Sequence, residues 1–297
     1  MKVLITGAAG QVGYELMRQA PAAFEVSGLD SSKLDITQQS LLESVVSEYA
    51  PDLIINAAAY TAVDKAETDS DRAWAVNRDG VNYLAVAAEE RGIPLFHIST
   101  DYVFAGDADI AYRESDPTDP TGVYGASKLA GEVALAAACS RFLVLRTSWV
   151  FGAHGNNFVK TMLRLGAERE SLSIVADQRG GPTSAASIAA ALWQLAERYH
   201  REQVLPWGIY HFSGEPYCSW FDFAQNIFQQ ASQLGILSKL PELSAIATVD
   251  YPTPAKRPAW SVMDCSKITE QLGVKVPDWK KDLTLVLEEL KTNIKNN

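Results

Sequence analysis

Short apolar runs alternate with segments of helical periodicity through the first half of the chain. Five runs are apolar on both faces and rich in β-branched residues, as is typical of strands buried between two helix layers. They cover Lys2–Thr6, Glu25–Leu29, Leu53–Asn56, Leu95–Ser99 and Phe142–Thr147. The intervening stretches predict helices over Gln11–Gln19, Gln38–Tyr49, Ser70–Arg91 and Tyr124–Ala138. This alternation predicts an α/β fold built on a doubly wound parallel sheet.

The pattern changes after Trp149. Helices are predicted over Phe158–Arg169, Ala185–Tyr199 and Phe221–Leu234, and they alternate with short strands such as Gly208–Phe212. Turns rich in glycine and proline interrupt this part of the chain. We predict a first domain over residues 1-150, joined by part of 185-212, and a smaller α/β region mainly over residues 151-297.

Charge and composition narrow the function classes. The formal net charge is −10, without a run of lysines and arginines, which argues against a nucleic-acid partner because phosphates need a basic surface. The longest apolar stretches fall short of the ~20 residues of a membrane helix, and Met1–Thr6 leads into a strand rather than a signal peptide. Cys139, Cys218 and Cys265 are widely spaced, which indicates reduced thiols. We expect a cytoplasmic protein that does not bind membranes.

Three glycines follow the first predicted strand, at Gly7, Gly10 and Gly13. Glycine allows a tight turn whose N–H groups approach a pyrophosphate, at the positive end of the following helix. Asp30 ends the second strand, where a carboxylate accepts hydrogen bonds from the ribose hydroxyls of NAD. Lys33 lies close enough to meet a 2′-phosphate, so both NADH and NADPH remain open. The first domain is therefore predicted to be a Rossmann NAD(P)-binding domain.

Tyr124 and Lys128 are four residues apart and share one face of a predicted helix. A lysine ammonium beside a phenol is expected to lower the phenol's pKa, and the tyrosine can then donate a proton to a carbonyl oxygen as hydride arrives at carbon. Thr100 follows the fourth strand, at the sheet edge where ligands bind in such folds. The order of glycine loop, threonine and Tyr-x-x-x-Lys predicts a nicotinamide-dependent enzyme that acts on a carbonyl or an alcohol.

Longer motifs carry a resemblance to a known family. They are NAAAYTAVD at Asn56–Asp64, STDYVF at Ser99–Phe104, VYGASK at Val123–Lys128 and RTSWV at Arg146–Val150, followed by Gly181-Pro182-Thr183. With these and further matches over nearly the whole chain, the sequence resembles the extended short-chain dehydrogenase/reductase superfamily and, within it, the dTDP-4-dehydrorhamnose reductases. STDYVF and RTSWV are much more specific than the glycine loop.

The resemblance implies NADPH- or NADH-dependent reduction of the C4 ketone of dTDP-4-dehydro-6-deoxy-L-mannose to dTDP-L-rhamnose. Tyr124 would donate the proton, with Lys128 and Thr100 as catalytic partners. The dTDP-sugar would contact Thr100, Asp101 and Trp149. The positions that would line the cofactor are Gly7, Gly10, Gln11, Val12, Gly13, Asp30, Asp35, Ile36, Ala59, Tyr60, Thr61, Tyr124 and Lys128.

One departure from that family concerns a metal. Some members form a magnesium-bridged dimer through a glutamate in the first helix and carboxylates after the Gly-x-Pro-Thr turn. Glu15 is present, but the second segment, Ser184–Ser187, carries no carboxylate, although magnesium prefers charged oxygen ligands. The four histidines show no metal-ligand spacing. We expect no metal site, and a homodimer, if formed, would assemble differently.

Two alternatives remain open at the level of sequence. One is another sugar-nucleotide epimerase, reductase or dehydratase of the superfamily, although a dehydratase would need an Asp-Glu pair where this chain has Asp101-Tyr102. The other is a non-catalytic regulatory subunit resembling that of methionine adenosyltransferase. The intact set of Thr100, Tyr124 and Lys128 favours an enzyme.

Overall fold

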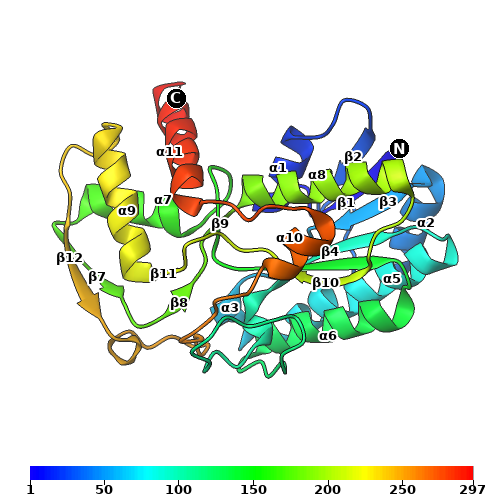
Figure 1. Ribbon diagram of the computed structural model, residues 1–297, viewed down its shortest axis with the longest axis horizontal. Coiled ribbons are helices and arrows are strands. Elements are labelled where there is room, and N and C mark those ends of the chain that lie inside the picture. Colours follow the sequence, from blue (N-terminus) through cyan, green and yellow to red (C-terminus); the bar gives the residue numbers. More distant parts are fainter. Residues whose placement is uncertain (297) are drawn as a thin grey trace.

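A six-stranded parallel sheet forms the centre of the computed structural model, which describes residues 1–296 (Figure 1). The strand order is β10-β5-β4-β3-β1-β2, and every pairing is parallel. The strands are β1 (Lys2–Thr6), β2 (Glu25–Leu29), β3 (Leu53–Asn56), β4 (Leu95–Thr100), β5 (Phe142–Thr147) and β10 (Gly208–His211). The predicted fold class is confirmed, and the five predicted strands of the first half are all present.

Helices cover both faces of this sheet because successive strand residues point to opposite sides. On one side Val3 and Ile5 share a core with α1 and α8. On the other side Leu4 packs in a second core with α2 and α5. The helices of the sheet are α1 (Gln11–Arg18), α2 (Gln39–Tyr49), α3 (Val63–Ala66), α4 (Ser70–Trp74), α5 (Gly80–Glu90), α6 (Val123–Ala138) and α8 (Ala185–Glu202).

The segment Ser70–Arg91 was expected to be one helix, and it is helical without a break from Ser70 to Glu90. A π-helical turn, η1 (Ala75–Asp79), separates α4 from α5. Its carbonyl at Asn77 meets α6 so closely that a Cβ on Gly131 would lie 2.0 Å from that oxygen. Packing against α6 therefore accompanies the widened turn, and it brings the Asn77 side chain toward the site described below.

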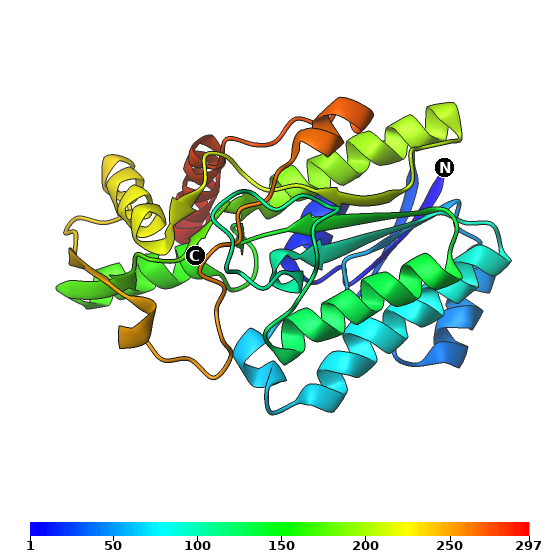
Figure 2. The ribbon, with the colours of Figure 1, turned by 60° about the horizontal axis from the view of Figure 1, so that its bottom comes forward.

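The second region has its own apolar core, and Figures 1 and 2 show its helices grouped at one end of the molecule. This core includes Phe151, Met162, Phe223, Ile227 and Leu287. The elements are β6 (Val150–Phe151), α7 (Phe158–Glu168), β7 (Ser171–Val175), β8 (Arg179–Gly180), β9 (Thr183–Ser184), β11 (Cys218–Ser219), α9 (Trp220–Gln233), β12 (Glu242–Ile246) and α11 (Trp279–Asn296). Helix α10 (Ser266–Leu272) instead packs against β10, in the core of the first sheet. Short 3₁₀ turns lie at Asp101–Val103 and Thr248–Asp250.

The chain returns to the first sheet before it completes this second region. Helix α8 packs on α1, and the Trp193 indole donates a hydrogen bond to the Leu16 carbonyl at 3.0 Å. Strand β10 then pairs with β5 at the sheet edge. The three cysteines are buried and unpaired, and within residues 1–296 every helix is too short or too polar to cross a membrane.

Candidate active site

The glycine turn after β1 packs too tightly for any side chain at two of its positions. Gly7 has φ +71°, and a Cβ there would lie 2.5 Å from the Ala58 nitrogen. A Cβ on Gly13 would lie 2.1 Å from the Gly7 oxygen. Gly10 is the N-cap of α1, where no side chain caps the helix. The first N–H groups of α1 are thus oriented to bind an anion, as the predicted pyrophosphate site requires.

Gln11 and Val12, the next two predicted cofactor positions, have side chains with other partners. Val12 packs into the core between the sheet and α8. The Gln11 Oε1 accepts a hydrogen bond of 2.9 Å from Asn157, which precedes α7 in the second region. The two side chains are therefore engaged within the protein, and Gln11 also links the two regions.

Asp30 lies directly after β2, at the carboxyl edge of the sheet. Its Oδ1 accepts hydrogen bonds from the N–H and the hydroxyl of Ser32, at 2.9 and 2.5 Å. These hydrogen bonds lower the pKa of Asp30 below its usual value. The carboxylate is thus ionised near neutral pH and held in one orientation, which suits it to accept hydrogen bonds from a ribose.

Asp35 and Ile36, which were expected to line the cofactor, make contacts within the protein. The Asp35 carboxylate accepts two hydrogen bonds from Thr37 and forms an ion pair of 3.0 Å with Arg72. The Ile36 side chain is buried in the core, in close contact with Gly80. Their role in cofactor binding stays a prediction, and the Ile36 side chain packs in the core.

The loop Ala59–Thr61 is tied to α6 through one buried amide. Asn77 accepts a hydrogen bond from the Tyr60 N–H at 2.9 Å and donates to the Tyr60 carbonyl at 3.1 Å. It also donates to the Ser127 hydroxyl at 3.0 Å. Sequence reasoning missed Asn77, because an asparagine inside an apolar helical pattern carries no local signal of its partners.

Tyr124, Lys128 and Thr100 are brought together at the carboxyl end of β4. Tyr124 and Lys128 lie in the first two turns of α6, and the Tyr124 phenol lies close to the Thr100 side chain. Burial raises the pKa of Tyr124 well above its usual value, opposite to the lowering expected from Lys128. Burial also lowers the pKa of Lys128 to about 8, and its Nζ donates to the Ile98 carbonyl at 2.7 Å. The phenol is therefore protonated at neutral pH and can act as an acid.

Three buried oxygens at the ends of β4 and β5 have no hydrogen-bond partner within the part of the chain that the structure describes. They are Ser99 Oγ, Asp101 Oδ2 and Thr147 Oγ1. Buried polar atoms are nearly always paired in proteins, so this edge is suited to a ligand rich in hydroxyl groups. Burial raises the pKa of Asp101 to about 6, although its Oδ1 accepts a hydrogen bond from the Thr100 hydroxyl at 3.0 Å.

Trp149 lies just beyond β5 with φ +47°, a backbone conformation that non-glycine residues rarely adopt. Its indole stacks on Trp220, with ring centroids 3.6 Å apart and planes 7° from parallel. It also packs over Gly180, where a Cβ would lie 2.6 Å from the ring. Trp220 donates to the Gln178 side chain at 3.2 Å. Sequence reasoning missed Trp220, whose stacking partner lies 71 residues earlier in the chain.

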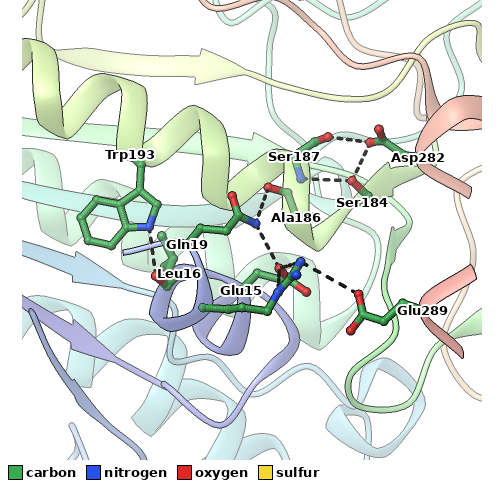
Figure 3. Close-up of polar contacts among 10 residues, drawn as sticks. Glu15, Leu16, Gln19, Ser184, Ala186, Ser187, Trp193, Asp282 and Glu289 are labelled. Carbon is green, nitrogen blue, oxygen red and sulfur yellow. Dashed lines mark hydrogen bonds and ion pairs between the residues drawn. The ribbon is translucent and has the colours of Figure 1, made fainter. Parts of the chain in front are cut away.

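Glu15, the candidate magnesium ligand of the first helix, is held by groups of this same chain (Figure 3). It is buried, and its Oε2 accepts hydrogen bonds from Arg18 at 2.6 and 2.9 Å and from Gln19 at 3.0 Å. Arg18 also reaches Glu289 on α11 at 4.0 Å. A guanidinium that already neutralises this carboxylate does not fit a magnesium site.

The second candidate segment also has a partner within the chain. Ser184 and Ser187 both donate hydrogen bonds of 2.5 Å to Asp282 on α11, as Figure 3 shows. Ser184 Oγ in turn accepts from the Ser187 N–H and caps α8. Within residues 1–296 no group of three or more His, Cys, Asp or Glu residues is arranged to hold a metal ion. These hydrogen bonds and ion pairs thus join α1, α8 and α11.

The fold and this site define a class of protein. A glycine turn after the first strand of a parallel sheet, with a Tyr-x-x-x-Lys helix beside the end of β4, belongs to a nicotinamide-dependent oxidoreductase of the Rossmann type. Residues 1–292 of this chain match the protein family that is described as "RmlD substrate binding domain". The chain belongs to this family, whose relatives are dTDP-4-dehydrorhamnose reductases, and the resemblance noted in the sequence is confirmed.

The similarity extends over the full length of the relatives. The dTDP-4-dehydrorhamnose reductase of Aggregatibacter actinomycetemcomitans is 47% identical over 284 residues, which is 95% of this chain and 97% of that protein. The reductase structure from Clostridium acetobutylicum has a TM-score of 0.91 at 36% identity, covering 98% and 100% of the two chains. The Bacillus anthracis reductase, solved in complex with NADP, has a TM-score of 0.90 at 38% identity, covering 97% and 99%.

Proposed function

We propose that the protein reduces the C4 ketone of dTDP-4-dehydro-6-deoxy-L-mannose to dTDP-L-rhamnose, with NADPH or NADH as cofactor and Tyr124 as proton donor. The observation that carries the proposal is the position of the Tyr124 phenol, beside the Thr100 hydroxyl at the carboxyl end of β4, in a chain of this reductase family. The NADP-bound relative supports the cofactor.

The cofactor region would be residues 1-150 joined by part of 185-212, and the substrate region mainly residues 151-297. Backbone N–H groups at Gly10–Val12 would hold the pyrophosphate, and Asp30 would orient the adenosine ribose. Lys128 would hold the nicotinamide ribose, and the loop Ala59–Thr61 would line the cofactor from the β3 side. When bound, the reduced nicotinamide supplies hydride to the substrate carbon.

The reacting ketone would lie between Thr100 and Tyr124. Thr100 would orient the ketone oxygen, and Tyr124 would transfer its phenolic proton to that oxygen as the carbon is reduced. Its raised pKa keeps this proton in place until negative charge develops on the substrate oxygen. Asp101 would accept hydrogen bonds from sugar hydroxyls. The stacked Trp149–Trp220 pair would provide a flat apolar surface for the nucleotide-sugar.

A spectrophotometric assay tests the proposal. The keto-sugar nucleotide, generated by coupled enzymes, is added with NADPH or NADH, and loss of absorbance at the reduced nicotinamide band is followed. Tyr124→Phe is expected to lower kcat by ~10²–10⁴, the usual contribution of a positioned proton donor, with substrate binding retained. Tyr83→Phe on α5 is the matched control, and it should keep full activity.

The outcomes of this assay distinguish the proposed reductase from the alternative functions. If the natural protein consumes neither cofactor, the proposed reductase activity is wrong. An epimerase returns its hydride and consumes no net NADPH while converting the sugar, and a regulatory subunit binds the cofactor without turnover. Near-normal kcat in the Tyr124→Phe variant would leave the reductase activity standing but would remove Tyr124 as the proton donor.

A further inference from the structure

A chain of buried polar side chains runs behind the reacting groups, from β1 to α6. The Thr6 hydroxyl donates to Asn56 Oδ1 at 2.7 Å, and Asn56 Nδ2 lies 2.9 Å from His97 Nδ1. The other ring nitrogen, His97 Nε2, lies 3.4 Å from Lys128 Nζ. Thr6, Asn56 and His97 have no exposed surface, and Lys128 is 2% exposed. The proposed mechanism gives His97 no role.

The hydrogen-bond donors fix the orientation of Asn56. Its Oδ1 also accepts the backbone N–H of Ala58 at 3.0 Å, and a backbone N–H can only donate. A flipped amide would place two donors against each other at that contact. The amide nitrogen of Asn56 therefore faces His97, and because it too can only donate, His97 Nδ1 must be an unprotonated acceptor.

The position of the remaining ring proton follows. Burial, reinforced by the positive charge of Lys128, lowers the pKa of His97 well below its usual value, so the ring is neutral. A neutral imidazole carries one proton, and with Nδ1 accepting, that proton resides on Nε2. The N–H of His97 thus points at Lys128 Nζ. An amine nitrogen can accept this N–H, whereas an ammonium has only donors to offer.

We propose that His97, oriented by Asn56, is a positioning residue that presents its Nε2–H to Lys128 and thereby makes the Lys128 ammonium a ready proton donor for Tyr124. After Tyr124 has given its proton to the substrate oxygen, one N–H bond of the ammonium breaks and the phenolate takes that proton. Lys128 is left as a neutral amine that accepts the His97 N–H, and it regains a proton from solvent water. The inference rests on the proposed function.

Other ionisable groups near Lys128 do not replace His97 in this role. Glu132 lies one turn further along α6 and raises the pKa of Lys128, but less than burial lowers it. Glu132 is itself held in a buried ion pair of 2.7 Å with Arg146. Tyr124 is on the same helix, and Asp101 acts on Tyr124 from the end of β4. These four groups stay unchanged in the variants below.

The first experiment does not depend on activity. Nitrogen-15 NMR of the imidazole side chains reports which ring nitrogen carries the proton, and the His97→Gln variant assigns the His97 signals by removing them. We expect a neutral ring protonated at Nε2 at pH 7. A ring protonated at Nδ1, or at both nitrogens, would overturn the inference whatever the protein's reaction proves to be.

The second experiment measures the pH profile of kcat in the reductase assay. His97→Leu removes the N–H that opposes the ammonium, so the basic limb should move to higher pH by about one unit, a tenfold change in proton affinity. KM for the keto-sugar nucleotide should change by less than about twofold, because His97 does not contact the substrate in the proposed mechanism. His97→Gln places an amide N–H toward Lys128, so its profile should stay near that of the natural protein.

Asn56→Asp replaces the amide N–H that faces His97 by a carboxylate oxygen of almost the same size, so a hydrogen-bond donor becomes an acceptor. An aspartate accepts from His97 Nδ1, which moves the ring proton to that nitrogen and turns a lone pair of Nε2 toward Lys128. The basic limb should then move to higher pH, as in His97→Leu. If the Leu and Asp variants lose activity equally at every pH, His97 has only a structural role. If the natural protein shows no turnover, the proposed function fails while the NMR result stands.

Discussion

Arg146→Met tests how strongly the protein depends on a buried ion pair that joins α6 to the sheet. Arg146 lies on β5 and Glu132 on α6, and each is 2% exposed. The guanidinium donates to both carboxylate oxygens of Glu132, with N–O distances of 2.7, 3.0 and 3.2 Å. Methionine keeps most of the aliphatic volume, and the substitution leaves the Glu132 carboxylate without its cation.

The magnitude follows from burial. Removing one partner of a buried ion pair typically costs about 3–5 kcal/mol, because an uncompensated charge remains in the interior. For a chain of 297 residues, an unfolding entropy of roughly 2 cal/mol/K per residue converts this loss into a fall of about 5–8 °C in Tm. An exposed pair of equal length would change Tm by less than about 2 °C, since such pairs contribute at most about 1 kcal/mol.

Thermal unfolding followed by circular dichroism at pH 7 is the assay. Arg164→Met is the matched control, because Arg164 pairs with Glu168 at 3.1 Å while both side chains are more than half exposed. The double variant Glu132→Gln/Arg146→Met should recover part of the loss, since no lone carboxylate remains. A Tm for Arg146→Met within about 1 °C of the control, close to the exposed-pair value, would refute the reasoning.

Three further outcomes can be checked. Gly13→Ala should lower the free energy of unfolding by about 1–3 kcal/mol through overpacking against Gly7 and weaken NADPH binding, measured by urea unfolding and fluorescence titration; unchanged values would contradict the tight turn. Dialysis against EDTA should leave turnover and oligomeric state unchanged, because Arg18 already neutralises Glu15; losses restored by Mg²⁺ would contradict this. Because the pKa of Asp101 is raised to about 6 from 3.8, the folded state binds more protons, so stability relative to Asp101→Asn should fall by about 3 kcal/mol as pH rises from well below 4 to well above 6; a flat difference in urea unfolding would contradict that pKa.

The strands could be predicted because a buried strand has a characteristic local sequence. A strand covered on both faces needs apolar residues at successive positions, as in Val3-Leu4-Ile5, and the structure places these three in cores on opposite faces of the sheet. The π-helical turn within the helix predicted over Ser70–Arg91 had no such signal. It accompanies the close approach of Asn77 to Gly131, a contact between residues 54 positions apart.

The proposed reacting residues could be predicted from the sequence for a related reason. Tyr124 and Lys128 are neighbours on one helix, and Thr100 ends a strand whose carboxyl edge is the ligand edge of this fold. The residues that contact them could not be predicted in this way. His97 lies inside a strand that looks like core, and its contacts, Asn56 and Lys128, come from separate elements. A pattern with period 2 or 3.6 carries no information about which side chains meet across elements.

The places where the structure breaks general rules of protein architecture coincide with the ligand edge of the sheet. Ser99, Asp101 and Thr147 bury oxygens without partners within the described part of the chain, and Trp149 holds a backbone angle that costs free energy. A fold selected for stability alone would remove such features. All four residues lie at or just beyond the ends of β4 and β5, next to Thr100, so a polar ligand bound there would supply the missing hydrogen bonds. Local destabilisation at this edge is thus a physical argument, separate from the sequence motifs, for the proposal that the sugar binds there.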